Sequence, residues 1–270
     1  MLYSDELFQL HVAHAPMASI YYEDLIFHPL MDIKKDDAFT KINQCKKHFY
    51  FLEPSGVKTI LDPMLIEIDI DTVIELYTAA DNIPNKIDSE RFLTGLQVYF
   101  GRDNGKLIPI FEPIKMGWMK FDGKTMDDIY SICREDKYWK YDAKITSNSK
   151  LVALSDAEFI GLKDAYKNTL WVKRNEDVGT LYAPYDSLKN DTESLIIPFQ
   201  AIFKLTGTEK NLFMHNAVRK QIGTPLETIK HSILISTSTI TLPGGAGAFS
   251  NRSHLCPPCD GIEVGFDLAT

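Results

Sequence analysis

The sequence lacks a long apolar segment, and this absence bears on membrane insertion. Its most apolar run, residues 195–205, is interrupted by Pro198, Gln200 and Lys204. A membrane-spanning helix needs about 18 apolar residues in a row. The N-terminal stretch MLYSDEL contains no positively charged segment followed by an apolar one, which a secretory signal would show. We therefore expect a cytoplasmic protein that does not insert into a membrane.

The sequence also lacks an excess of basic residues. It holds 29 Lys and Arg against 37 Asp and Glu, a net charge of −8 with histidine neutral. Proteins that bind nucleic acid through the phosphate backbone need clustered Lys and Arg. The densest basic clusters, residues 34–35 and 46–48, are short, and aspartates flank the first. We expect no nucleic-acid partner and interpret both clusters as solvated surface.

Cysteine is scarce, with 4 in 270 residues, which fits a reducing compartment and excludes a disulfide scaffold. Cys45 and Cys133 are isolated, and we interpret both as small buried apolar residues. Cys256 and Cys259 have two residues between them in the tail sequence HLCPPC. Two thiolates at this spacing can hold one zinc ion, with His254 as a further ligand.

Three interpretations of this tail stay open. The same cysteine spacing serves thiol–disulfide exchange, and a turn without chemistry or a local disulfide is the third alternative. A redox pair usually begins a helix, and Pro258 opposes a helix starting at Cys256. A structural zinc site usually has a second CxxC or an HxxxH, and the chain has neither. No cofactor is predicted, with zinc at Cys256, Cys259 and His254 as the alternative.

The sequence has ordinary globular composition, 44% hydrophobic and 24% charged residues. Its clearest local signal is a hairpin, in which the apolar runs 96–100 and 106–111 are joined through Asn104-Gly105. Pro109 lacks an N–H, so we expect the second strand to lie at a sheet edge or to be bulged. Hairpins among helices predict an α+β fold with a mixed, largely antiparallel sheet, several helices and a loop-rich C-terminal tail.

Other elements are predicted from periodicity, caps and β-branched runs. The expected strands are residues 47–52, 65–70, 170–172 and 231–242. The expected helices are residues 72–80 capped by Asp71, 126–133, 155–168 opened by a capping box at Ser155, and 209–221, while 194–205 is expected to be a strand followed by a helix.

We expect residues 1–242 to form a single elaborated domain. The polar segment 141–150 is a candidate internal boundary. Residues 243–270, which contain Gly, Pro and Cys, form the tail.

Other motifs are weaker. Gly244–Gly247 matches no phosphate-binding signature and is interpreted as a loop. The acidic row Glu67, Asp69 and Asp71 is interpreted as a solvent face with a helix cap, although carboxylates can also bind Mg²⁺ or Ca²⁺. Residues 236–238 (STS) resemble the core strand of ADP-ribosyltransferases, but the E-x-E turn of that family is missing.

No complete catalytic signature is present, and the G-x-S-x-G elbow of serine hydrolases is missing. The leading hypothesis is a non-catalytic binding module whose partner is another protein. The alternative is a metal-dependent or thiol-based enzyme or redox module that uses Cys256 and Cys259. The sequence indicates no particular small-molecule ligand.

Overall fold

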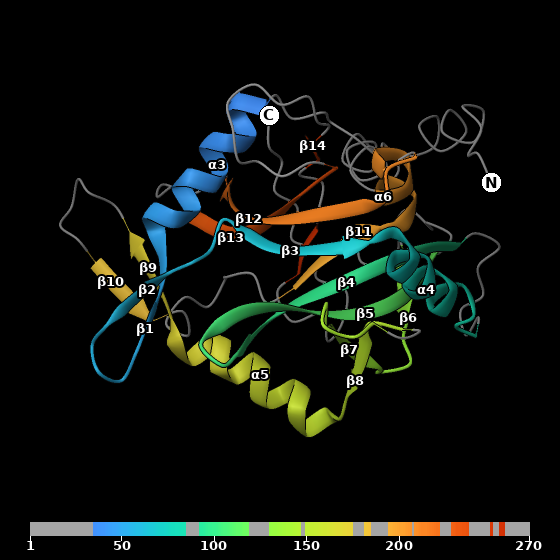
Figure 1. Cartoon of the computed structure of the whole chain (residues 1–270), viewed down its shortest axis with the longest axis horizontal. Coiled ribbons are helices and arrows are strands. Elements are labelled where there is room, and N and C mark those ends of the chain that lie inside the picture. The colour runs from blue at the N-terminus through green and yellow to red at the C-terminus, as the bar shows by residue number, and fades with distance from the viewer. Residues whose placement is uncertain are drawn as a thin grey trace, which may run out of the picture.

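The described strands form three antiparallel sheets with helices packed on their faces, as the computed structural model of the chain shows (Figure 1). The expected α+β class is confirmed. None of the described helices is long and apolar enough to cross a membrane. The structure describes residues 35–84, 92–118, 130–146, 149–174, 181–184, 194–206, 208–221, 228–237, 249–250 and 254–256.

The central sheet has the strand order β15-β11-β4-β5-β7-β8, and β6 also pairs with β5. Its strands are β4 Phe92–Asp103, β5 Lys106–Trp118, β6 Tyr130–Cys133, β7 Tyr138–Tyr141, β8 Leu151–Leu154, β11 Ser194–Pro198 and β15 His254–Cys256. The segment between β7 and β8 contains most of residues 141–150 and joins neighbouring strands of this sheet.

Two further sheets have four strands each. One has the order β10-β9-β1-β2, with β1 Phe49–Leu52, β2 Lys58–Ile60, β9 Leu170–Arg174 and β10 Leu181–Pro184. The other has the order β14-β13-β12-β3, with β3 Met64–Asp69, β12 Asn211–Gln221, β13 Thr228–Ser236 and β14 Phe249–Ser250.

The hairpin of β4 and β5 forms as the sequence predicts. Asn104 and Gly105 adopt φ values of 48° and 78°, which the tight turn requires. The expectation for Pro109 is wrong, because β5 lies inside the sheet and its register with β4 is unbroken. On its other side β7 pairs with Ile110 and Phe111. Pro109 lies beside that short ladder, so its missing N–H interrupts none of these pairs.

Two predicted helices are strands. Residues 211–221 form β12, which lies between β13 and β3 and is buried from Leu212 to Val218. Tyr130–Cys133 forms β6 and pairs with the end of β5 at Lys115–Trp118. In both cases pairing with neighbouring strands overrides the local helical pattern.

The helices are α3 Lys35–His48, α4 Ile70–Asp81, α5 Asp156–Thr169 and α6 Phe199–Thr206. The predicted capping box opens α5: the Ser155 side chain accepts from the Glu158 N–H, and the Glu158 side chain accepts from the Ser155 N–H. The predicted cap of α4 is wrong by two residues. Asp69, not Asp71, accepts from the Thr72 N–H at 2.9 Å, because the strand before the helix ends at Asp69.

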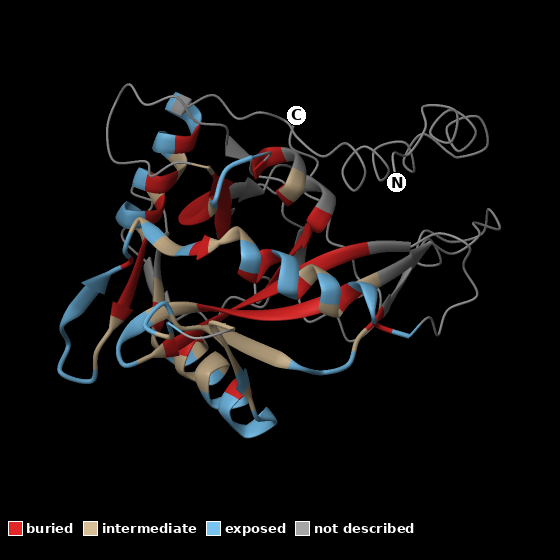
Figure 2. Ribbon diagram, turned by 45° about the vertical axis from the view of Figure 1, so that its right-hand side comes forward, coloured by how far each residue is buried: buried red, intermediate tan, exposed pale blue. Residues whose placement is uncertain are grey.

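The main core lies between the central sheet and the sheet of β12 and β13, with α4 and α6 at its margin (Figures 1 and 2). Leu96, Val98 and Phe100 of β4 face this core. Residues of the opposite parity, such as Tyr99, pack against Phe159 of α5. The fold therefore gives the central sheet two covered faces. Both isolated cysteines are buried as predicted: Cys45 is 1% exposed and Cys133 4%.

Candidate functional site

The structure places only part of the predicted tail site. His254 and Cys256 lie in β15, where they stand opposite Ile196 and Ser194 of β11. Cys259 lies outside the described residues, as does Gly244–Gly247. Among the residues that the structure describes, no three His, Cys, Asp or Glu side chains gather in a group that could hold a metal ion.

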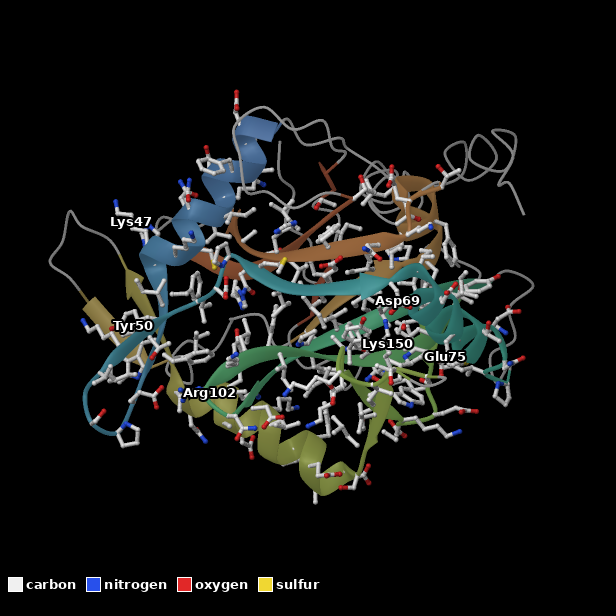
Figure 3. The ribbon with its side chains drawn as sticks, in the orientation of Figure 1. Lys47, Tyr50, Asp69, Glu75, Arg102 and Lys150 are labelled. Carbon is white, nitrogen blue, oxygen red and sulfur yellow. The ribbon has the colours of Figure 1, made fainter. Side chains whose placement is uncertain are left out.

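In the acidic row, Asp69 and Glu67 bind different hydrogen-bond partners. The Asp69 carboxylate accepts from Lys150 Nζ at 2.9 Å and from the Tyr141 hydroxyl at 3.0 Å, besides capping α4 (Figure 3). Burial opposes its ionisation, but the hydrogen bonds from Lys150, Thr72 and Tyr141 outweigh burial and hold the Asp69 pKa well below its usual range. Glu67 accepts from Asn211 at 2.8 Å. These contacts support the interpretation as a solvent face and helix cap.

The strongest candidate surface is the β2 edge, which we define as Val57–Ile60. A tight turn after β1 builds it: Gly56 N–H donates to the Glu53 carbonyl at 2.8 Å, and Gly56 adopts φ 81°. β2 then pairs with β1, with Ile60 opposite Tyr50. This strand is missing from the expected elements. The β-branched run Val-Lys-Thr-Ile after a Pro-Ser-Gly turn is the signal that identifies it.

The outer side of β2 is exposed. β2 ends the strand order of its sheet, so no described strand pairs with its outer edge. All three β2 residues are exposed, and the apolar side chains of Val57 and Ile60 are 59% and 63% exposed. Figure 2 shows β2 and the turn before it in pale blue at the left margin of the molecule, beside the mostly red β1. An edge strand presents backbone N–H and C=O groups to any chain that lies alongside it.

The inner side of the same hairpin is fixed. Phe51 is 1% exposed in the main core. The Arg102 guanidinium stands 4.4 Å from the Phe51 ring centroid and forms an ion pair with Glu53. On the opposite face, Lys58 Nζ stands 4.9 Å from the Tyr50 ring centroid. The Arg102 contacts hold β1 in place, and pairing with β1 together with the Lys58 contact keeps β2 extended.

The surroundings of the β2 edge are basic in an acidic protein. Residues 41–60 contain four lysines and one glutamate, a net charge of +3 where the whole chain has −8. Lys46, Lys47 and Lys58 are exposed. Lys46 and Lys47 also lie in the last turn of α3, where positive charge stabilises a helix. Figure 3 shows Lys47 at this end of the molecule and Glu75 at the other.

A second group of polar residues lies in the central sheet and is buried. The Tyr99 hydroxyl donates to Glu112 Oε2 at 2.8 Å, and Arg134 Nη1 lies 4.0 Å from the same oxygen. Burial raises the pKa of Glu112, and the Tyr99 hydrogen bond and Arg134 lower it. Glu112 is 1% exposed, so an outside substrate has no direct contact with it.

A third group surrounds His231, which is fully buried. Its Nδ1 contacts the Tyr166 hydroxyl at 2.8 Å, and its Nε2 contacts Asn216 Oδ1 at 3.0 Å. Burial lowers the pKa of His231 to about 3. This group joins α5, β12 and β13 in the core, and its three side chains are at most 1% exposed.

Comparisons of the chain with protein-family models, with curated proteins and with solved structures give no match. Functional inference for this chain therefore depends on its own geometry.

Proposed function

We propose that this chain is a binding protein and that its β2 edge receives an extended, acidic segment of a partner polypeptide. The partner segment adds as a strand alongside Val57–Ile60. Main-chain hydrogen bonds then supply attraction, and side chains at alternate positions supply selectivity.

The observation that carries this proposal is the exposure of Ile60 on an outermost strand and of Val57 directly before that strand. Short length and a charged residue protect a strand edge against association, and β2 has both features, the charge being that of Lys58. Two large apolar side chains beside that lysine serve association instead, because burying one stabilises a complex by about 1.5–3 kcal/mol before entropic costs.

The charge around the edge selects the partner. Lys46, Lys47 and Lys58 attract an acidic segment and repel a basic one. They also disfavour pairing of β2 with β2 of a second copy, because that arrangement brings the two basic ends together. A strand of three residues buries little surface, so we expect weak and reversible binding that salt weakens further.

A peptide titration tests strand addition directly. The probe is a short labelled peptide in which glutamate and valine alternate, followed by fluorescence anisotropy. Its controls are the same peptide with lysine for glutamate and the same peptide N-methylated at alternate residues, which removes main-chain donors and keeps the charge. Binding of the acidic peptide alone is the expected result. Equal binding of the N-methylated peptide contradicts strand addition.

Two matched substitutions locate the site. Ile60→Ser is expected to weaken peptide binding about tenfold, the equivalent of about 1.4 kcal/mol. Ile160→Ser, on the 51% exposed Ile160 of α5, is expected to leave binding unchanged. Lys58→Glu is expected to abolish the preference for the acidic peptide, whereas Lys137→Glu at another exposed lysine keeps it. Equal effects of Ile60→Ser and Ile160→Ser contradict the location.

A second candidate function is zinc binding at the tail. The observation that favours it is that His254 and Cys256 occupy alternate positions of β15, an arrangement that suits two ligands of one ion. Cys259 is the proposed third ligand. The test is the metal content of protein purified without chelator, compared between the native chain and Cys256→Ser. About one zinc per chain that the substitution removes supports the site, and metal-free native protein contradicts it.

A further inference from the structure

Two buried oxygen atoms on neighbouring strands have no hydrogen-bond partner among the residues that the structure describes. They are Oε1 of Gln97 on β4 and Oε1 of Glu112 on β5, and each residue is 1% exposed. The two residues stand directly opposite each other in the register of the hairpin. Side chains at such positions share one face of the sheet, with Cβ atoms about 5 Å apart. A buried polar atom without a hydrogen bond destabilises the folded state.

The remaining polar atoms of the pair are engaged. Glu112 Oε2 accepts from the Tyr99 hydroxyl at 2.8 Å. Gln97 Nε2 donates to Ser194 Oγ at 2.9 Å. Both unpaired atoms are therefore acceptors. A hydrogen bond between them requires a proton on one of the two oxygens.

We propose that the Gln97–Glu112 pair is a proton-binding site, in which the neutral carboxyl group of Glu112 donates its hydrogen from Oε1 to Oε1 of Gln97. One proton satisfies both unpaired atoms. Burial supports the neutral form, because it raises the pKa of Glu112. A carboxyl group in apolar surroundings can stay protonated near neutral pH and act as a hydrogen-bond donor.

The site has a second complete arrangement when the proton leaves. If Glu112 releases its proton to water, a half-turn of the Gln97 amide lets Nε2 donate to the Glu112 carboxylate. The amide oxygen of Gln97 then accepts from the Ser194 hydroxyl. Proton release thereby reverses the hydrogen bond between Gln97 and Ser194. Ser194 begins β11 and stands opposite Cys256 in β15, the last strand in the described order of the central sheet. The change in hydrogen bonding therefore takes place on the strand that pairs with β15.

The groups around Glu112 set the pH at which the proton leaves. Arg134 is the nearest cation to the carboxyl group among the ion pairs of the described residues, at 4.0 Å, and it favours proton release, whereas Asp136 opposes it. Because burial is the largest of these effects, Glu112 releases its proton at a pH above the ordinary glutamate pKa. The titratable or charged groups that neighbouring elements contribute here are Tyr99 from β4, Arg134 and Asp136 from the β6–β7 connection, Tyr138 from β7, and Asp156 and Lys163 from α5.

Infrared difference spectroscopy tests the proton directly. The native spectrum minus that of Glu112→Gln is expected to contain the C=O stretch of a protonated carboxylic acid at neutral pH. The matched control Glu67→Gln, at an exposed glutamate, is expected to leave the acid band in place. In a pH titration the acid band is expected to persist through neutral pH and to disappear only at higher pH, whereas an ordinary glutamate titrates at about 4.3.

Two further measurements do not require Glu112→Gln to fold. Titration of the native chain with ¹³C-labelled glutamate detects the same acid band without a substitution. Gln97→Leu removes the acceptor, and the acid band is expected to move to higher frequency. Native protein without an acid band at neutral pH has an ionised Glu112 and overturns the proposal. An acid band that Gln97→Leu leaves unmoved overturns the link to Gln97.

Discussion

The Tyr166 hydroxyl and His231 Nδ1 lie 2.8 Å apart in the centre of the protein. Asn216 fixes the direction of this bond. Its Nδ2 donates to the Asp62 carbonyl at 2.7 Å, so its Oδ1 faces His231 Nε2 as an acceptor. His231 therefore carries its hydrogen on Nε2, and Nδ1 accepts from Tyr166. The His231 ring also packs 4.2 Å from the ring centroid of Phe100 on β4, so a single side chain links the sheets.

We predict that Tyr166→Phe destabilises the protein by about 1–3 kcal/mol, because it leaves buried Nδ1 of His231 without a donor. The measurement is the free energy of unfolding in urea. The matched control is Tyr77→Phe, which keeps the ring contacts of Tyr77 with Phe199 and Phe203 and is expected to change stability by less than about 0.5 kcal/mol. Equal losses in the two variants contradict the role of the Tyr166 hydroxyl.

His231 also predicts a loss of stability in mild acid. Burial lowers its folded-state pKa to about 3, while the unfolded value is about 6.5. Below the unfolded value the unfolded chain binds a proton that the folded chain does not, so stability falls as pH decreases towards 3. The contribution lost at about pH 5 is about 2 kcal/mol.

The measurement is the difference in unfolding free energy between the native chain and His231→Gln, followed from neutral pH to about pH 5. Taking the difference removes the opposite contribution of Glu112, whose raised pKa favours the folded state as pH falls. The difference is expected to shrink as the pH decreases. A constant difference between native and His231→Gln contradicts the prediction.

Local signals predicted the elements that depend on local chemistry. Asn104-Gly105 gave the hairpin because both residues tolerate positive φ, and Ser155 and Glu158 gave the start of α5 because their reciprocal hydrogen bonds lie within one turn. Residues 211–221 misled the prediction because the stability of β12 comes from β13 and β3, which are distant in sequence. Helical propensity contributes little free energy compared with hydrogen bonding to a neighbouring strand on both sides.

The candidate sites were hidden from the sequence for the same reason. Gln97, Glu112 and Ser194 lie on three strands, and only the register of β4 with β5 and β11 brings them together. Tyr166 and His231 are 65 residues apart. The sequence did show the β-branched run of the β2 edge, but its exposure follows from the strand order.

The corrected cap of α4 gives a third prediction. Asp69→Ala removes the hydrogen bond that caps α4 at the Thr72 N–H and the hydrogen bonds from Lys150 and Tyr141. We expect the loss of the cap alone to lower the free energy of unfolding by about 0.5–2 kcal/mol. Asp71→Ala, at the exposed first turn, is expected to cost less than about 0.5 kcal/mol. Urea unfolding of both variants decides between the two aspartates, and a larger cost for Asp71→Ala contradicts the observed cap.

The pH dependence of the Asp69 contribution has a definite sign. The hydrogen bonds that lower its folded-state pKa stabilise the ionised form. The contribution is therefore complete above the unfolded aspartate value of about 3.9 and is lost as the pH falls below it. The difference between native protein and Asp69→Ala is accordingly expected to be constant near neutral pH and to shrink in strong acid.

The last prediction compares two glycines, one packed against α5 and one within α5, that differ in the space around them. A Cβ at Gly101 would lie 2.7 Å from Ile110 Cδ1 and 3.3 Å from Leu162 Cβ, so β4 approaches α5 closely there. Ile110 is fully buried and has little room to move. Gly101→Ala is expected to cost about 1–3 kcal/mol through overpacking.

Gly161 lies within α5, and a Cβ there meets nothing within 4 Å. Gly161→Ala is expected to stabilise the protein by about 0.8–1 kcal/mol, because alanine is the better helix former. The same substitution therefore has opposite signs at two positions that differ in the space for one methyl group. Urea unfolding measures both, and a stabilising Gly101→Ala would show that Ile110 and α5 yield at no cost and that the contact of β4 with α5 does not require glycine.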